Sequence, residues 1–438
     1  MVKSLIWWFR IAVFNLMLVA FIGVLLRYKI AYAFPVVHQK HLLHAHSHFA
    51  FTGWVTQILM VLLVARLYTG LQNPLKKYAP VLYANLIAAY GMLFTFPFQG
   101  YGTYSIVFST LSIFAAYVFA VIYWRDLNKG KEKSAGDPWF KAALFFNVIS
   151  SAGAFALAVM MVTKSVHPDR YLAASYYFLH FQYNGWFFFA CIGLLFHQLN
   201  VWGIKLRSDK RIFWLFTLSC IPAYFLSALW LPIPLWVYIL VIVAACCQLA
   251  GFTLLFNGIR TYFTRLKPLI TPLGKWLIGL SGVALTIKLL LQAGSTIPAL
   301  SKLAFGFRSI VIGYLHLILL GVITLFILGY VVINQYMRIN KMAVRGIVIF
   351  IAGIILNELI LFVQGTGAIS YTSVPYTNEM LLGAAIVLFA GMLMLNVSQR
   401  QRNAYGDGAG WRAVGAGHAN HRRRLGCDRC TYHRVQPT

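Results

Sequence analysis

The sequence predicts an all-α polytopic membrane protein of about twelve transmembrane helices, arranged as three repeated four-helix arcs. The composition predicts the class, because 60% of the 438 residues are hydrophobic and only 11% are charged. Apolar stretches long enough to cross a bilayer follow one another with short connections through the first 398 residues. Each stretch must be helical, since lipid offers the backbone no hydrogen-bond partner.

The twelve apolar stretches define the expected elements in chain order. We expect membrane helices centred near residues 16, 56, 88, 114, 150, 187, 220, 244, 282, 322, 355 and 388. The first stretch follows Lys3 and Arg10, which gives it some signal-peptide character. Because its removal would leave eleven spans and break the repeat described next, we expect it to be retained.

A histidine followed five residues later by glycine occurs three times, each time near the start of an apolar stretch. The phrases are His48-Phe-Ala-Phe-Thr-Gly-Trp, His180-Phe-Gln-Tyr-Asn-Gly-Trp and His316-Leu-Ile-Leu-Leu-Gly-Val. Their separations of 132 and 136 residues match about four membrane helices with their connections. The predicted repeats therefore cover roughly residues 1–133, 134–267 and 268–398.

The net charge of +28 reflects membrane topology and does not indicate nucleic-acid binding. Basic residues gather in alternate connections, whereas three of the opposite connections, 99–104, 232–234 and 366–378, contain no Lys or Arg. The positive-inside rule then places both termini in the cytoplasm, and we expect the membrane to be a bacterial inner (plasma) membrane. By the same rule the three histidine phrases lie toward the outer face.

Residues 399–438 differ in kind from the rest of the chain. From Arg400 onward the chain contains eight Arg and no Lys, with abundant Gly and Ala. This composition predicts a disordered basic cytoplasmic tail, or a segment of unrelated origin. Its Cys427-Asp-Arg-Cys430 is followed by Thr431, where covalent heme attachment requires His.

The second apolar stretch has five histidines in eleven residues. His41, His44 and His48 are spaced by three and four and therefore line one helical stripe, whereas His46 points roughly the other way. Such a stripe suits a metal, a proton path to the outer surface or a heme ligand. His38 and His41 are expected at the membrane interface.

These phrases resemble the heme-copper oxidase subunit I superfamily, which includes the nitric oxide reductase large subunit and related twelve-helix heme-copper proteins of nitric oxide response. Ile312-Gly-Tyr-Leu-His316-Leu-Ile-Leu-Leu-Gly is similar to the helix 10 phrase of that family, and the His48 phrase to its helix 2. The resemblance covers about residues 1–398 and implies a fold of three four-helix arcs. It also implies that His48 and His316 bind a low-spin heme b from its two faces.

The resemblance implies further sites. Arg308, Lys40 and Arg170 would pair with heme propionates. His180, with His44 or His46, would hold a second metal, copper or non-heme iron, and Tyr314 stands where the family has its high-spin heme ligand. The seventh stretch, Ile212 to Trp230, contains no histidine, and Asn184 stands where nitric oxide reductases have glutamate. Four-electron reduction of oxygen at a standard binuclear centre is therefore not expected.

Two charged residues lie deep within apolar sequence. Lys288 and Glu358 fall in the outer halves of the ninth and eleventh stretches. Residues of this kind normally pair or carry protons. We therefore expect either a Lys288–Glu358 ion pair or a proton relay that includes them and Tyr183.

Three function classes follow. The first is a heme-binding protein related to redox or to NO or O2, with a degenerate second metal site. The second is an active terminal oxidase or nitric oxide reductase, an oxidoreductase of the respiratory chain, with unusual ligands. The third is a transporter of metal or solute lined by histidines. Besides membrane lipid, the expected partners are a quinone, cytochrome c or accessory subunits, with no nucleic acid.

Overall fold

The computed structural model describes residues 2–32, 34–67, 74–130 and 133–400. Every regular element in these ranges is helical. The predicted C-terminal tail lies outside the described residues, except for Gln399 and Arg400 at the end of the last helix.

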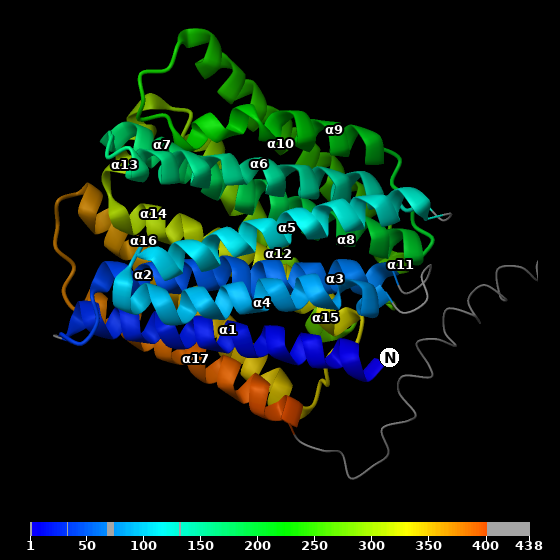
Figure 1. Cartoon of the computed structure of the whole chain (residues 1–438). Coiled ribbons are helices and arrows are strands. Elements are labelled where there is room, and N and C mark those ends of the chain that lie inside the picture. The colour runs from blue at the N-terminus through cyan, green and yellow to red at the C-terminus, as the bar shows by residue number, and fades with distance from the viewer. Residues whose placement is uncertain (1, 33, 68–73, 131–132, 401–438) are drawn as a thin grey trace, which may run out of the picture. The chain divides into compact units, whose positions relative to one another are not determined.

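Ten helical segments are long and apolar enough to cross a membrane, which confirms an α-helical polytopic membrane protein. They are α1 (Val2–Ala31), α2–η1–α3 (Gln39–Arg66), α4 (Pro74–Gln99), α5 (Thr103–Lys129), α6 (Asp137–Val162), α10 (Leu235–Thr261), α12 (Pro272–Gly294), α14–η5–α15 (Arg308–Ile333), α16 (Lys341–Ile369) and α17 (Thr377–Arg400). Figure 1 shows the beginning of α1 and the end of α17 at the same end of the bundle.

The sixth and seventh predicted spans are helical but are not among these ten. The sixth is formed by α7 (Pro168–His180), η3 (Phe181–Phe187) and α8 (Phe188–Val201), which follow one another without a break. In the seventh, α9 (Asp209–Cys220) gives way to a short 3₁₀ helix, η4 (Pro222–Ser227). Pro222 ends α9, because proline lacks an amide N–H and its ring clashes with the preceding turn. Two shorter helices, α11 (Phe263–Leu266) and α13 (Pro298–Gly306), lie in connections.

A π-helical segment begins directly after each of the three histidines. These segments are η1 (Phe49–Thr56), η3 (Phe181–Phe187) and η5 (Leu317–Thr324), which follow His48, His180 and His316. π-Helical turns are rare in proteins and occur frequently at functional sites. The three phrases that are alike in sequence therefore also share an unusual local backbone.

Two equivalent Trp–Thr hydrogen bonds join the π segments, one between η1 and η5 and one between η3 and η1. Trp54 of η1 donates to Thr324 of η5 (3.0 Å), and Trp186 of η3 donates to Thr56 of η1 (3.3 Å). In both pairs the tryptophan lies six residues after its histidine and the threonine eight residues after. The third pair would join η5 to η3, where Val322 and Phe188 occupy these positions and no such bond can form.

Along the two central helices that contain η1 and η5, the share of buried residues differs before and after the π segment. In α3 (Gln57–Arg66) every residue except Arg66 is buried, and in α15 (Leu325–Ile333) every residue except Ile333. On the histidine side, α2 (Gln39–His48) has only two buried residues and α14 (Arg308–His316) has none. In the described chain η3 packs against η5 and α3 against α8, whereas α2, α7 and α14 do not pack extensively on one another. The central helices are therefore closely packed beyond the π segments and more open before them.

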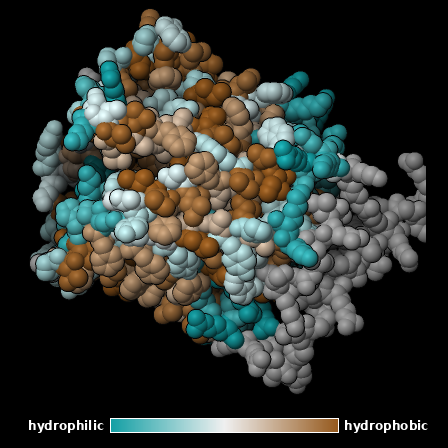
Figure 2. Space-filling view, viewed as in Figure 1, coloured by the Kyte–Doolittle hydropathy of each residue, from teal (hydrophilic) through white to brown (hydrophobic). Residues whose placement is uncertain are grey.

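The outer surface is apolar, as lipid contact requires. Figure 2 shows hydrophobic side chains over the middle of one face, with hydrophilic side chains gathered toward its two ends. Large exposed side chains include Phe94, Phe98, Trp236 and Phe362. A water-soluble protein rarely exposes so much contiguous apolar surface.

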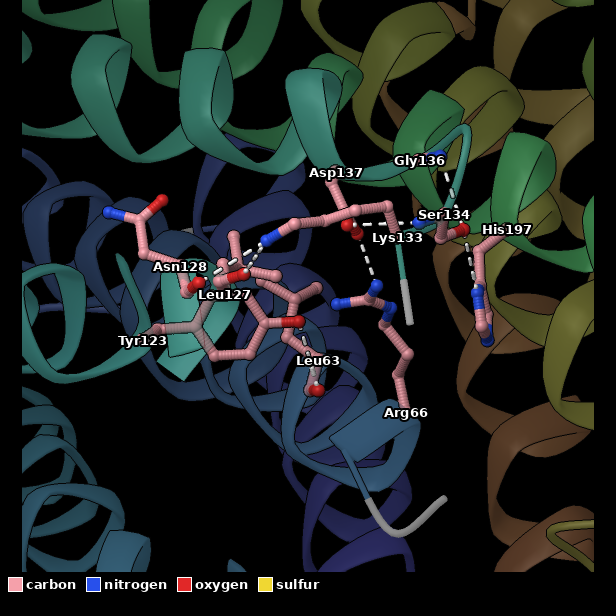
Figure 3. Close-up of polar contacts among 10 residues, drawn as sticks. All are labelled: Leu63, Arg66, Tyr123, Leu127, Asn128, Lys133, Ser134, Gly136, Asp137 and His197. Carbon is pink, nitrogen blue, oxygen red and sulfur yellow. Dashed lines mark hydrogen bonds and ion pairs between the residues drawn. The ribbon is translucent and has the colours of Figure 1, made fainter. Parts of the chain in front are cut away.

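A buried ion pair joins α3 to α6 at the closely packed end. Arg66, the last residue of α3, pairs with Asp137, the first residue of α6, and both side chains are about nine-tenths buried. Asp137 also accepts a hydrogen bond from the Ser134 backbone N–H (3.0 Å), and the Ser134 hydroxyl contacts His197 Nδ1 of α8 (3.1 Å). Figure 3 shows these contacts converging between the three helices.

Candidate functional site

His48 and His44 are directed toward α4. His48 Nε2 lies 3.1 Å from the Tyr101 hydroxyl, and its ring stacks on Phe96 with 4.5 Å between ring centroids. The His44 ring meets Tyr101 edge-on at 4.7 Å. Burial raises the pKa of Tyr101, in the turn between α4 and α5, to about 12, so its hydroxyl keeps the proton that it can donate to His48.

His46 lies on the opposite side of α2 and faces α1. Its Cε1 would be 3.5 Å from a Cβ added at Gly23, and its ring interacts with the backbone carbonyl of Val19. Its Nδ1 is buried and has no hydrogen-bond partner within the described residues. The ring also interacts electrostatically with His316 of α14 and with Arg27 of α1. His46 therefore presents an unused ring nitrogen in a region shared with a second histidine.

His316 is held in one tautomer by its own helix. Its Nδ1 lies 2.9 Å from the Ile312 carbonyl oxygen, one turn earlier. Because a carbonyl oxygen only accepts, Nδ1 carries the proton and Nε2 keeps its lone pair. Histidines that bind a metal through one ring nitrogen are commonly oriented in this way, by donating the other N–H to a carbonyl oxygen. His316 also interacts with Arg27.

An electrostatic interaction links His316 with His46, whereas none is found between His316 and His48 in the described chain. Residues two apart on an α-helix point about 200° away from each other, so only one of His46 and His48 can face α1 and α14. Heme binding by His48 together with His316 stays a prediction, although His48 is turned toward Tyr101 in this structure.

Arg27 lies near His46 and His316, and Arg308 lies near Arg27. Arg27 interacts electrostatically with both histidines and with Arg308. Within the described residues, the ion pairs are formed elsewhere, so neither arginine is neutralised by a carboxylate. Lys40 lies near His44, and no contact of Arg170 with a site residue is found in the described chain. The two arginines form a cationic group suited to an anionic ligand.

His180 is completely satisfied by the protein. It is 0% exposed, its Nε2 donates to the Cys220 carbonyl oxygen (2.9 Å), and Asn184 Nδ2 donates to its Nδ1 (3.1 Å). No lone pair is left for a metal. The structure also separates His180 from His44 and His46, which face α4 and α1, and the described residues contain no group of three or more metal-ligating side chains. A second metal held by His180 with His44 or His46 therefore stays a prediction that these contacts do not support.

The other expected residues occupy separate places. Tyr314 interacts with Tyr183, which itself lies close to Ser227. Lys288 and Glu358 do not form the expected ion pair: Glu358 accepts a hydrogen bond from Asn357 (3.2 Å), whereas Lys288 lies near Cys220. A proton relay through Lys288, Glu358 and Tyr183 stays a prediction.

Sequence reasoning missed Arg27, a charged residue within the apolar part of α1 whose position was visible in the sequence. A comparison with models of known protein families and with curated proteins yields no match to this chain. The site must therefore be interpreted from its own geometry and from the resemblance of its histidine phrases.

Proposed function

We propose that this chain is a heme-binding integral membrane protein of the heme-copper oxidase type, which holds one low-spin heme b between His46 and His316. The observation that carries this proposal is the electrostatic interaction of His46 with His316 and of both with Arg27, which, like the neighbouring Arg308, has no carboxylate partner in the described chain. Two imidazoles with two arginines match the iron and the propionates of a heme.

The residues present fit such a group. Hydrogen bonding leaves His316 Nε2 with its lone pair, and His46 has a buried nitrogen without a partner among the described residues. The helices that carry these histidines are also the less closely packed halves of the central segments. When bound, heme b would supply a one-electron redox centre. The roles of the protein are then to fix the imidazole of His316 through Ile312 and to neutralise propionates through Arg27 and Arg308.

The proposal includes a fold of twelve helices in three four-helix arcs. It counts α7–η3–α8 and α9–η4 as the sixth and seventh spans, in addition to the ten long apolar helices. Support for a threefold arrangement comes from the three π segments and from the two equivalent Trp–Thr bonds between them. We place the protein in a bacterial inner membrane, with cytoplasmic termini and the heme toward the outer face.

The chemistry proposed is electron transfer or a response to NO or O2, with electrons supplied by a quinone, cytochrome c or an accessory subunit. A second metal at His180 does not fit, because both of its nitrogens are hydrogen-bonded within the protein. An active oxidase or nitric oxide reductase would need ligands from other positions or from a partner. No observation favours the histidine-lined transporter.

The direct test is an optical spectrum with heme extraction on the detergent-purified chain. One non-covalent heme b per chain, with the sharp reduced bands of a low-spin b-type cytochrome, is the expected result. Binding of carbon monoxide by only a small fraction of the heme would show that both axial positions are filled. A chain that is folded but free of heme after expression with ample heme supply contradicts the proposal.

A further inference from the structure

A small cavity lies away from the His46–His316 site, between η3, α8, α9, α10 and α12. Its volume is about 10 Å³, which is room for roughly one water-sized particle. Three phenylalanine rings and four polar side chains line it. The polar residues are Asn184, Cys220, Gln248 and Lys288.

Lys288 is the unusual member of this lining. Lys288 is only 6% exposed. Its side chain forms no hydrogen bond or ion pair with any other described residue. Its nearest aromatic contact is with Phe188, whose ring centroid lies 6.0 Å from Nζ. An ammonium group buried in this way is strongly destabilising unless an opposite charge or a set of acceptors compensates it.

The groups that face Lys288 carry no negative charge. His180 and Cys220 interact with it electrostatically, but the ring nitrogens of His180 are both engaged and Cys220 is a buried thiol. The Gln248 side chain is buried, and its Oε1 has no partner in the described part of the chain. The cavity therefore combines a buried amine, a carboxamide oxygen without a partner in the described chain and no negatively charged group.

We propose that this cavity binds one small monovalent anion of the halide class. The Lys288 ammonium supplies charge and N–H donors, and the Gln248 carboxamide supplies a further N–H once its oxygen and nitrogen are exchanged by rotation. The volume excludes phosphate, sulfate and carboxylates, because none of them fits a space of about one water. The anion completes the polar interior around His180 and Asn184 and is independent of heme.

The test compares halide with a large anion at constant ionic strength. Purified wild-type chain is titrated with sodium bromide or sodium chloride against sodium gluconate while Tm is measured, alongside Lys288→Met and the control Lys275→Met on the same helix. We expect saturable halide stabilisation of the wild type and of Lys275→Met, and at least tenfold weaker halide binding in Lys288→Met. A bromide anomalous peak beside Lys288 Nζ is expected in crystals of the wild type.

The wild-type measurements test halide binding even if Lys288→Met does not fold. Equal Tm values in bromide and gluconate, or a cavity occupied by water with no anomalous peak, overturn the proposal and indicate a neutral lysine bonded to water. The heme spectrum, recorded in the same salts, should not change. A protein without heme that still responds to halide would therefore separate this inference from the proposed function.

Discussion

Replacing Asp137 with Asn should destabilise the protein by about 3–5 kcal/mol, because it removes the negative charge from a buried ion pair. The carboxylate and the guanidinium are both about nine-tenths buried, and Asp137 also accepts the Ser134 backbone N–H. The side chain of Asn keeps the shape and can still accept one bond, so the loss comes mainly from the charge. Unfolding in detergent, followed by circular dichroism over a denaturant series, measures this loss.

A second ion pair at the same end of the bundle provides the matched control. Lys77, whose side chain is 49% exposed, pairs with buried Asp126, which also accepts a hydrogen bond from Tyr78 (2.8 Å). Lys77→Gln should therefore cost less than Asp137→Asn, since water can reach the half-exposed end of this pair and Asp126 keeps its hydrogen bond from Tyr78. If Asp137→Asn and Lys77→Gln cost the same, the reasoning from burial is refuted.

Two further predictions concern the π segments and the turn near His48. Trp54→Phe should cost about 1–3 kcal/mol in the same unfolding assay, because buried Thr324 loses its hydrogen-bond donor. If the stability losses of Trp54→Phe and Thr324→Val simply add in the double variant, the hydrogen bond between them is contradicted. Tyr101→Phe should cost about 0.5–1.5 kcal/mol below pH ~10. Because the pKa of Tyr101 is raised to about 12 in the folded state, this contribution is lost as pH rises from ~10 through that value, and a difference that grows with pH would contradict it.

The fold class could be predicted because hydropathy acts locally. Apolar runs of membrane length specify helices whatever their neighbours, and ten of them are present as expected. The seventh apolar stretch was predicted less well as a single membrane helix, since Pro222 interrupts its helix after Cys220. The π-helical backbone was not anticipated, although the histidine phrases marked where each π segment begins.

The candidate site could be predicted only in part, because it depends on which face of a helix meets which neighbour. Spacing showed that His46 and His48 point in different directions, but only the packing of α1 against α2 shows that His46 faces Arg27 and His316. Lys288 and Glu358 were likewise expected to form an ion pair because both lie in the outer halves of their helices. Their actual neighbours are Cys220 and Asn357, because depth does not fix the direction of a side chain.

The central claim, that His46 and His316 bind the heme, is tested most directly by comparing three variants. Reduced-minus-oxidised spectra and heme content are measured for His46→Ala, His316→Ala and His48→Ala, each checked for a folded, monodisperse preparation. We predict that His46→Ala and His316→Ala lose the low-spin signal, whereas His48→Ala keeps it with at most a small shift. Loss of the signal in His48→Ala and its retention in His46→Ala would contradict the account.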